Sequence, residues 1–155
     1  MFPYHIAQIC TSGHLITDSY DLFEYERRNY CPKCGSPTIT SCPSCGAELR
    51  GAVEGVICEV PIDAYCSSCG KPFPWTVKAL DAVTACIREE EELDAILTEN
   101  LIESLPDIMT ETPATNLATI RCKKVLASAG KFTVEAIRQF VIDFGCELAK
   151  RSLLP

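Results

Sequence analysis

The sequence has no long hydrophobic run: no stretch approaches the ~20 apolar residues that a membrane-spanning helix needs. The first residues, Met1 to His5, also lack the basic start and apolar segment of a signal peptide, so the sequence gives no indication of export. We therefore expect a cytoplasmic protein that does not enter the membrane. In that compartment disulfides are rare, which bears on how the 11 cysteines are interpreted.

Positive charge is scarce as well. The chain contains 14 lysines and arginines against 21 acidic residues, a formal net charge of −7. Its first 75 residues carry five basic residues against eight acidic ones. Proteins bind nucleic acid largely by neutralising phosphates with lysine and arginine. We therefore do not expect nucleic acid as a partner.

Catalytic motifs are missing. The sequence contains no Ser/His/Asp pattern, no glycine-rich phosphate loop and no HExxH motif. A nucleophilic cysteine would need a histidine partner, and only two histidines are present. We predict that the protein is not an enzyme. The four cysteines outside the pairs described next are predicted to be small buried apolar residues: Cys58, Cys86, Cys122 and Cys146.

Paired metal ligands are abundant in the first seventy residues. The four pairs are Cys10/His14, Cys31/Cys34, Cys42/Cys45 and Cys66/Cys69. A CxxC turn lets two thiolates reach one ion, so eight ligands complete two tetrahedral sites and leave no open position. One histidine among the thiols favours zinc over iron, and the spacing favours metal over disulfides. The sequence therefore predicts two structural zinc ions per chain.

Three pairings of these ligands remain open at this stage. Sequential pairing, which we favour, places Cys10, His14, Cys31 and Cys34 on one ion and the other four ligands on the second. A second arrangement closes Cys31/Cys34 with Cys42/Cys45 on one ion. A third joins alternate pairs, which is the cross-braced arrangement of RING-type domains.

The chain changes character near residue 75. Residues 1–75 combine the ligand pairs with short β-type segments at 4–9, 15–17, 38–40 and 53–60, which predicts a double zinc-ribbon domain. Small domains of this kind rely on metals because short strands bury little apolar surface. Within it, 18–29 is a polar insertion, predicted to form one short helix with Leu22 and Tyr25 inward.

Residues 76–155 predict a small α-helical bundle, so the fold class is α+β. A helical face beginning at Thr76 loses phase at the acidic run 89–92 and resumes to Pro106, where we expect an end. Thr112-Pro113 should start the next helix, which runs through Leu117, Ile120, Cys122 and Val125 to Ala129 and is capped by Gly130. Thr133 should start the last helix, whose apolar side comprises Val134, Ile137, Phe140, Val141, Phe144 and Leu148. This wide side predicts a homo-oligomer.

Several segments are similar to a known family. The runs PYHIAQICTSGHLITDSYDLFEYERRNYCPKCG, TITSCPSCGAELRG, YCSSCGKPFPWT and IRCKKVLASAGK resemble a family of bacterial zinc-ribbon proteins catalogued as a domain of unknown function. The resemblance spans nearly the whole chain. It implies a bacterial, cytoplasmic protein with two zinc ions, and it implies no reaction.

Three functional hypotheses follow. The first is a non-enzymatic adaptor that binds another protein through a zinc-stabilised platform. The second is a nucleic-acid-binding or transcription-linked zinc ribbon, which would require Arg27, Arg28, Lys33, Arg50 and Lys71 to gather on one face with Tyr25, Tyr30 or Trp75. The third is a RING-like ligase scaffold, which would require cross-braced ligands.

Overall fold

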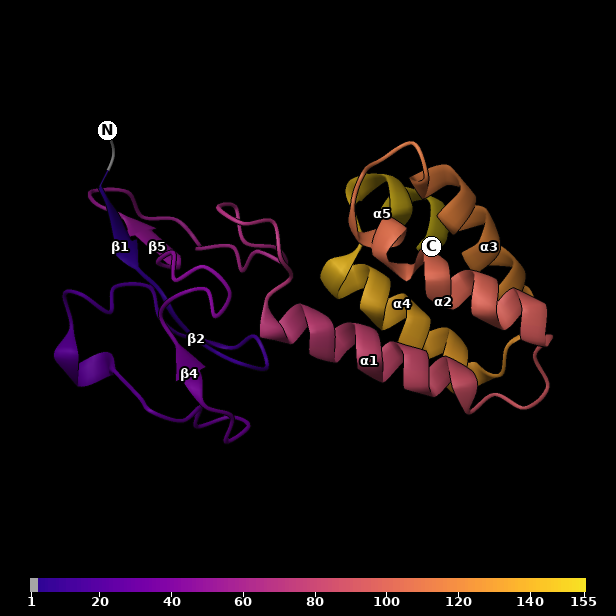
Figure 1. Ribbon diagram of the computed structural model, residues 1–155, viewed down its shortest axis with the longest axis horizontal. Helices are drawn as coiled ribbons and strands as arrows, with labels where there is room; N and C mark the ends of the chain where they lie inside the picture. The colour runs from indigo at the N-terminus through magenta and orange to yellow at the C-terminus, as the bar shows by residue number, and fades with distance from the viewer. Residues whose placement is uncertain (1–2) are drawn as a thin grey trace. The chain divides into compact units, whose positions relative to one another are not determined.

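Short strands make up the first part of the chain and helices the second, which confirms the predicted α+β class (Figure 1). The computed structural model describes residues 3–155, so Met1 and Phe2, part of the segment inspected for a signal peptide, lie outside it. The chain forms two units, Met1–Lys78 and Ala79–Pro155. Helix α1 (Pro74–Arg88) contains both this boundary and the predicted one at residues 75/76.

Five short strands build two antiparallel sheets in the described part of the first unit. Strand β1 (Tyr4–Ile6) pairs with β5 (Arg50–Val53), and β2 (Gln8–Cys10) lies between β3 (Leu15–Thr17) and β4 (Thr38–Ile39). The hairpin β2–β3 brackets the turn that holds the first ligand pair, and the predicted β-type segment 4–9 is divided between β1 and β2, which lie in different sheets. The main role of the two sheets is therefore to position the metal ligands rather than to bury an apolar core.

Two predictions in this unit are wrong. The strand expected at 53–60 ends at Val53, because Glu54 and Gly55 turn the chain there and Gly55 adopts φ +79°. In the insertion, one 3₁₀ turn, η1 (Glu24–Glu26), forms, but Leu22 and Tyr25 point outward. These side chains point outward because hydrogen bonds of polar groups, described below, hold the insertion in place.

Five helices occupy the described part of the second half: α1, α2 (Ala95–Met109), α3 (Thr115–Ser128), α4 (Lys131–Phe144) and α5 (Glu147–Leu153). The break at the acidic run is confirmed, and Asp94 caps α2 by accepting hydrogen bonds from the N–H groups of Ile96 and Leu97. The largest fully buried apolar side chains of the core come from α1 to α4: Ile87, Leu101, Leu105, Ile108, Val125, Ile137 and Val141. Across residues 3–155, no helix has the length and apolar character to span a membrane.

Helix ends differ most from the sequence predictions. Pro106 lies inside α2, which continues to Met109. Proline removes one backbone hydrogen bond, but burial of Ile108 and Met109 beyond it favours the last turn. Helix α3 begins at Thr115, after a turn in which the Thr112 hydroxyl accepts from the N–H of Ala114.

The last predicted helix is two helices. Gly130 has φ −68° and is the N-cap of α4 rather than a left-handed C-terminal cap. Thr133 does not cap: its hydroxyl donates to the Glu90 carboxylate, which also accepts from the N–H of Gly130. The chain bends at Gly145, so Leu148 belongs to α5.

The apolar side of the last predicted helix is partly internal. Ile137, Phe140 and Val141 are buried within the helical unit, whereas Val134, Phe144 and Leu148 are partly exposed. The homo-oligomer inferred from this side stays a prediction. On α3, by contrast, Leu117 and Ile120 are half exposed, because Ala118, Cys122 and Val125 form the inward face.

Candidate metal centres

Four tight turns present the predicted ligands. In each CxxCG turn the first cysteine N–H donates across the turn and its carbonyl accepts from the glycine N–H, as in Gly35 N to Cys31 O, 2.8 Å. The turn at Cys10 has the same closure, with Gly13 N to Cys10 O at 2.9 Å. All four glycines have positive φ, from +73° to +95°, a conformation that glycine adopts without strain. The glycines are therefore part of the ligand geometry.

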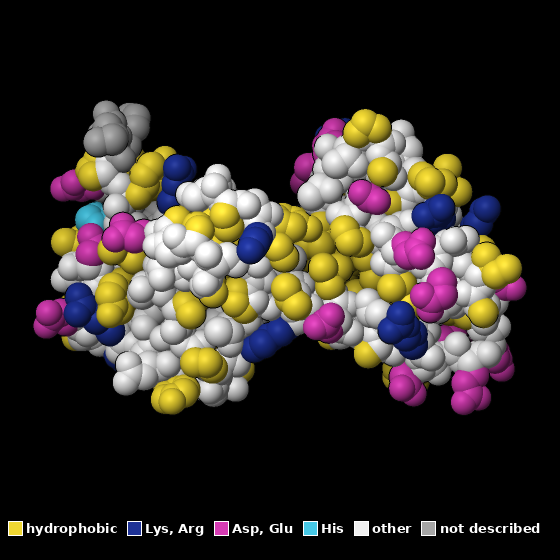
Figure 2. Space-filling view, in the orientation of Figure 1, with side chains coloured by type: hydrophobic (Ala, Val, Ile, Leu, Met, Phe, Trp, Pro, Cys, Tyr) yellow, Lys and Arg dark blue, Asp and Glu magenta, His cyan; other side chains and the backbone are white. Residues whose placement is uncertain are grey.

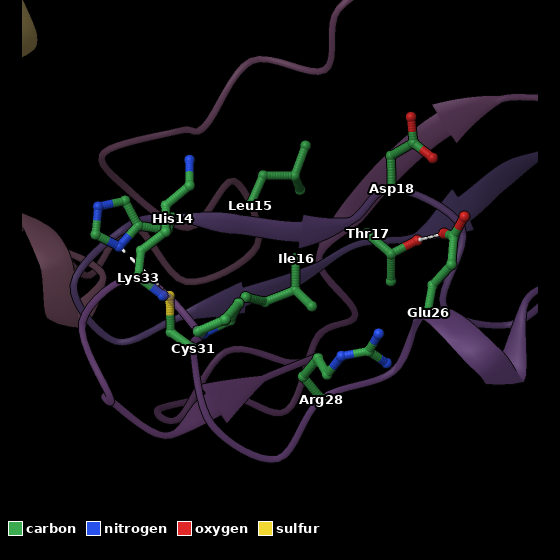
Figure 3. A pocket seen from close by; sticks show the side chains of 10 residues that line it. His14, Leu15, Ile16, Thr17, Asp18, Glu26, Arg28, Cys31 and Lys33 are labelled. Atoms are coloured by element: carbon green, nitrogen blue, oxygen red, sulfur yellow. Dashed lines mark hydrogen bonds between the residues drawn. The ribbon is translucent and has the colours of Figure 1, made fainter.

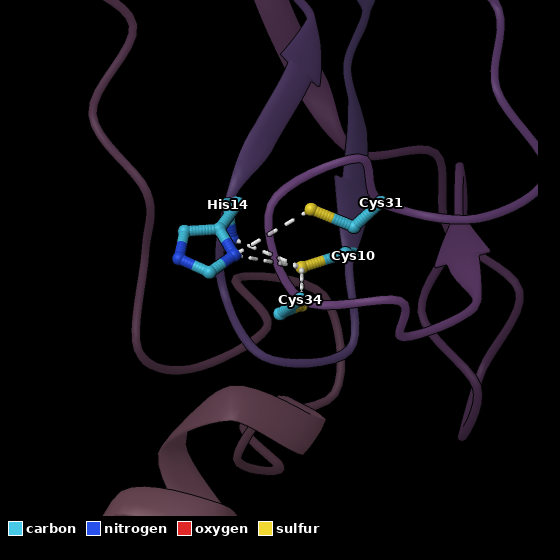
Figure 4. A group of neighbouring side chains, drawn as sticks. All are labelled: Cys10, His14, Cys31 and Cys34. Atoms are coloured by element: carbon cyan, nitrogen blue, oxygen red, sulfur yellow. Dashed lines mark hydrogen bonds between the residues drawn. The ribbon is translucent and has the colours of Figure 1, made fainter.

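The eight predicted ligands come together as two groups of four. The first contains Cys10, His14, Cys31 and Cys34, whose side chains converge in Figure 4. The second contains Cys42, Cys45, Cys66 and Cys69. In each group all four ligand atoms lie within 4.8 Å of one another. We call these groups centre one and centre two.

Both groups have the dimensions of a tetrahedral zinc site. Zinc–sulfur bonds of about 2.3 Å place two sulfurs about 3.8 Å apart, and a zinc–nitrogen bond of about 2.0 Å gives a nitrogen–sulfur separation of about 3.5 Å. The Sγ–Sγ distances are 3.8 Å for Cys10–Cys34 and 3.7 Å for Cys45–Cys66. His14 Nδ1 lies 3.5 Å from Cys10 Sγ and 3.6 Å from Cys31 Sγ. The donor set fits the ion.

Hydrogen bonds to sulfur prepare several thiols for metal. The N–H groups of His14 and Ser68 donate to the sulfurs of Cys10 and Cys66, at 3.2 and 3.4 Å. The Ser36 side chain and backbone lower the pKa of Cys34 to about 5. The N–H groups of Cys69 and Ser68 lower the pKa of Cys66 to about 6. Each centre thus offers a thiolate at neutral pH, the form that binds metal.

The grouping is the sequential one. A cross-braced domain would place alternate ligand pairs on one ion, but the first pair lies with the second and the third with the fourth. His14 faces the thiols of centre one through Nδ1, whereas His5 is bound to the Asp21 carboxylate at 3.0 Å. The RING-like hypothesis therefore lacks the geometry that it required.

The four remaining cysteines do not behave alike. Cys122 is buried in the helical core, and this burial raises the pKa of its thiol to about 12. Cys86 and Cys146 are partly buried. Cys58 is exposed, which contradicts its prediction, because the strand expected around it does not form.

Comparison with known proteins places the chain in a family. A family described as "Uncharacterized protein conserved in bacteria (DUF2321)" matches residues 3–153. The chain belongs to this family. No curated protein and no solved structure matches it. The match covers both units, so the two metal centres and the helices are parts of one family architecture.

A groove of about 490 Å³ runs beside centre one (Figure 3). One wall consists of residues 14–18, which include β3, an edge strand of its sheet. The other wall carries Glu26, Arg28 and Lys33. The sequence did not predict this groove, because it forms only when the insertion folds back beside β3.

Polar anchors hold the insertion in place. The buried Gln8 side chain donates to the Arg28 carbonyl at 2.6 Å and accepts from the Arg28 N–H at 3.1 Å. Asp21 accepts from the N–H of Ile6, and Glu26 accepts from the Thr17 hydroxyl. These bonds fix the backbone through polar groups, so the apolar side chains are left outside.

Proposed function

We propose that the protein is a non-enzymatic protein-binding module that two structural zinc ions hold in shape. Four protein ligands in each centre support a structural role, because a catalytic zinc keeps one position for water or substrate. The ions would then replace the hydrophobic core that a unit of such short strands lacks.

An exposed aromatic patch on the anchored insertion carries this proposal. It comprises Leu22, Phe23 and Tyr25, and Tyr25 is 73% exposed. The rings of Phe23 and Tyr25 lie 5.6 Å apart. Aromatic residues on a rigid surface loop are typical of protein interfaces. The patch and the groove share the insertion, so a partner could use both.

Two of the basic residues that the nucleic-acid alternative requires already contact other groups of this chain. Arg27 lies over the Tyr20 ring and donates to its carbonyl, and Arg50 lies over the Tyr4 ring. Trp75, a candidate for base stacking, is only 3% exposed. These observations favour a protein partner over the nucleic-acid alternative.

Binding to nucleic acid should accordingly be weak at physiological salt. Three thiolates with Zn²⁺ carry −1 and four carry −2, so the metals change the formal charge from −7 to about −10. Fluorescence anisotropy with labelled duplex DNA and single-stranded RNA should give no saturation in the micromolar range. A sub-micromolar affinity that weakens steeply with salt would instead support the zinc-ribbon alternative.

Site-specific cross-linking tests the proposed protein interface. A photoreactive phenylalanine analogue replaces Tyr25 in the full chain, expressed in bacteria that carry it naturally. The matched control places the same analogue at Phe132, an aromatic residue on α4 that is also exposed. We expect a discrete cross-linked species from position 25 only, and its loss on adding Phe23→Ser. Equal yields at both positions, or none at position 25, would contradict the proposal.

A further inference from the structure

The first turn of α1 is fastened to the turn that carries Cys10 and His14. Trp75 packs against this turn at Gly13, where an added Cβ would lie 3.1 Å from Trp75 Cβ. Lys78, one helical turn later, donates from Nζ to the hydroxyls of Thr11 and Ser12, at 3.0 and 3.3 Å. The helix start therefore contacts all three residues between the two ligands of this pair.

These contacts continue to the second ligand pair of the same centre. The Ser12 hydroxyl lies 2.8 Å from that of Ser36, and Ser36 is hydrogen-bonded to the Cys34 thiol. A chain of polar groups thus runs from the Lys78 ammonium to a ligand sulfur. With zinc bound, three thiolates give centre one a net charge of −1, and Lys78 supplies a nearby positive charge.

The first turn of α1 is also fixed on its other side. Trp75 Nε1 donates to the Asp63 carbonyl at 2.8 Å, and the buried Thr76 hydroxyl donates to the Ala64 carbonyl at 2.7 Å. Phe73 stacks on Trp75 with ring centroids 4.7 Å apart. The helix start is therefore held between the first ligand turn and the segment that precedes Cys66.

We propose that metal binding at centre one determines whether the first turn of α1 is ordered, and that Trp75 and Lys78 couple the two. The Cys10/His14 turn is held in shape by its metal, and without it the surface that receives Trp75 and Lys78 is lost. Because α1 continues from the metal unit into the helical unit, metal loss reaches the helix that joins them. Coupling of this kind is reciprocal: disturbing the helix start must also weaken metal binding at centre one.

Trp75 is the sole tryptophan in the chain, so its fluorescence reports this turn directly. We compare Cys34→Ser, which disables centre one, with Cys45→Ser, the equivalent change in centre two. Elemental analysis should find one zinc ion in each variant. We expect a red-shifted emission and several-fold stronger acrylamide quenching in Cys34→Ser, with a smaller change in Cys45→Ser. Quenching in Cys34→Ser that matches wild type, or does not exceed that of Cys45→Ser, would overturn the proposal.

A second variant leaves every ligand in place. Lys78→Gln removes the ammonium that donates to Thr11 and Ser12. Lys71→Gln is the control, because it also removes one positive charge but no side-chain hydrogen bond to the Cys10/His14 turn. Cobalt(II) replaces zinc because its absorption distinguishes a Cys₃His centre from a Cys₄ centre. We expect Lys78→Gln to weaken centre one by on the order of tenfold and to leave centre two unchanged. Equal cobalt affinity at centre one in Lys78→Gln and wild type would show that the helix start does not act on the metal, and the inference would fall.

This inference rests on the proposed structural role of the metal, and the two can fail separately. Wild-type protein without metal in centre one would refute the role of zinc. Wild-type protein with two ions, but with Trp75 fluorescence that is indifferent to centre one, would refute only the coupling.

Discussion

Chelation of zinc should unfold the metal unit and leave the helices folded. The first unit buries few large apolar side chains, and its longest strand, β5, has four residues. Metal binding by such a unit supplies apparent free energies of about 10–16 kcal/mol per structural zinc, which become folding free energy. The helical unit has its own buried core and no predicted metal ligand.

Hydrogen exchange and elemental analysis check this prediction together. Purified protein should contain two zinc ions per chain. After chelation, amide protection should be lost in residues 3–73 while the helical ellipticity of α2 to α5 persists. Cys31→Ser should retain one ion and lose protection around centre one. A content of about one ion, iron in place of zinc, or unchanged protection after chelation would contradict the proposed role of the metal.

The metal ligands were predictable because their spacing is local. A CxxCG segment specifies its own turn: the glycine supplies the positive φ, and the backbone bonds close the loop, whatever surrounds it. The pairing was not settled by spacing alone, because three arrangements use the same eight ligands. It depends on which turns the sheets bring together, and those contacts are long-range.

Most helices were predictable, but their ends and part of their inward faces were not. The break before α2 was predictable because the apolar helical face loses phase across the acidic run 89–92. Pro106 suggested an end that tertiary packing overrides through Ile108 and Met109. Gly130 suggested a C-terminal cap, whereas the Glu90 carboxylate, forty residues away in sequence, binds its N–H and makes it the start of α4. A hydrogen-bond partner so distant in sequence leaves no pattern in the residues around Gly130.

The candidate interface on the insertion could not be predicted from local sequence either. Leu22 and Tyr25 were predicted to face inward, because most apolar side chains on a short helix are buried. In the structure they face outward. The Gln8 side chain binds the Arg28 backbone of the insertion, and Asp21 accepts from the N–H of Ile6, so polar groups of the insertion face the rest of the fold. The side chains that sequence reasoning assigned to the core are therefore the ones available to a partner.

Ile108→Ala should destabilise the helical unit by about 2–5 kcal/mol and leave both metal centres intact. Ile108 is completely buried on α2, and its carbonyl accepts from the N–H of Cys146 at the start of α5. Truncation removes buried methyl and methylene groups and leaves a cavity that the surrounding helices fill only in part. All eight predicted ligands lie in the other unit, so zinc content should stay at two ions.

Ile96→Ala is the matched control, because it makes the same chemical change on the same helix at a side chain that is 72% exposed. Its effect should stay within about 0.5 kcal/mol. Urea denaturation followed by far-ultraviolet circular dichroism measures the helical unit, and Trp75 fluorescence follows the metal unit in the same samples. If Ile108→Ala also lowered zinc content or shifted the Trp75 transition, the two units would share one cooperative transition. If the two variants were equally stable, the assignment of Ile108 to the core would be wrong.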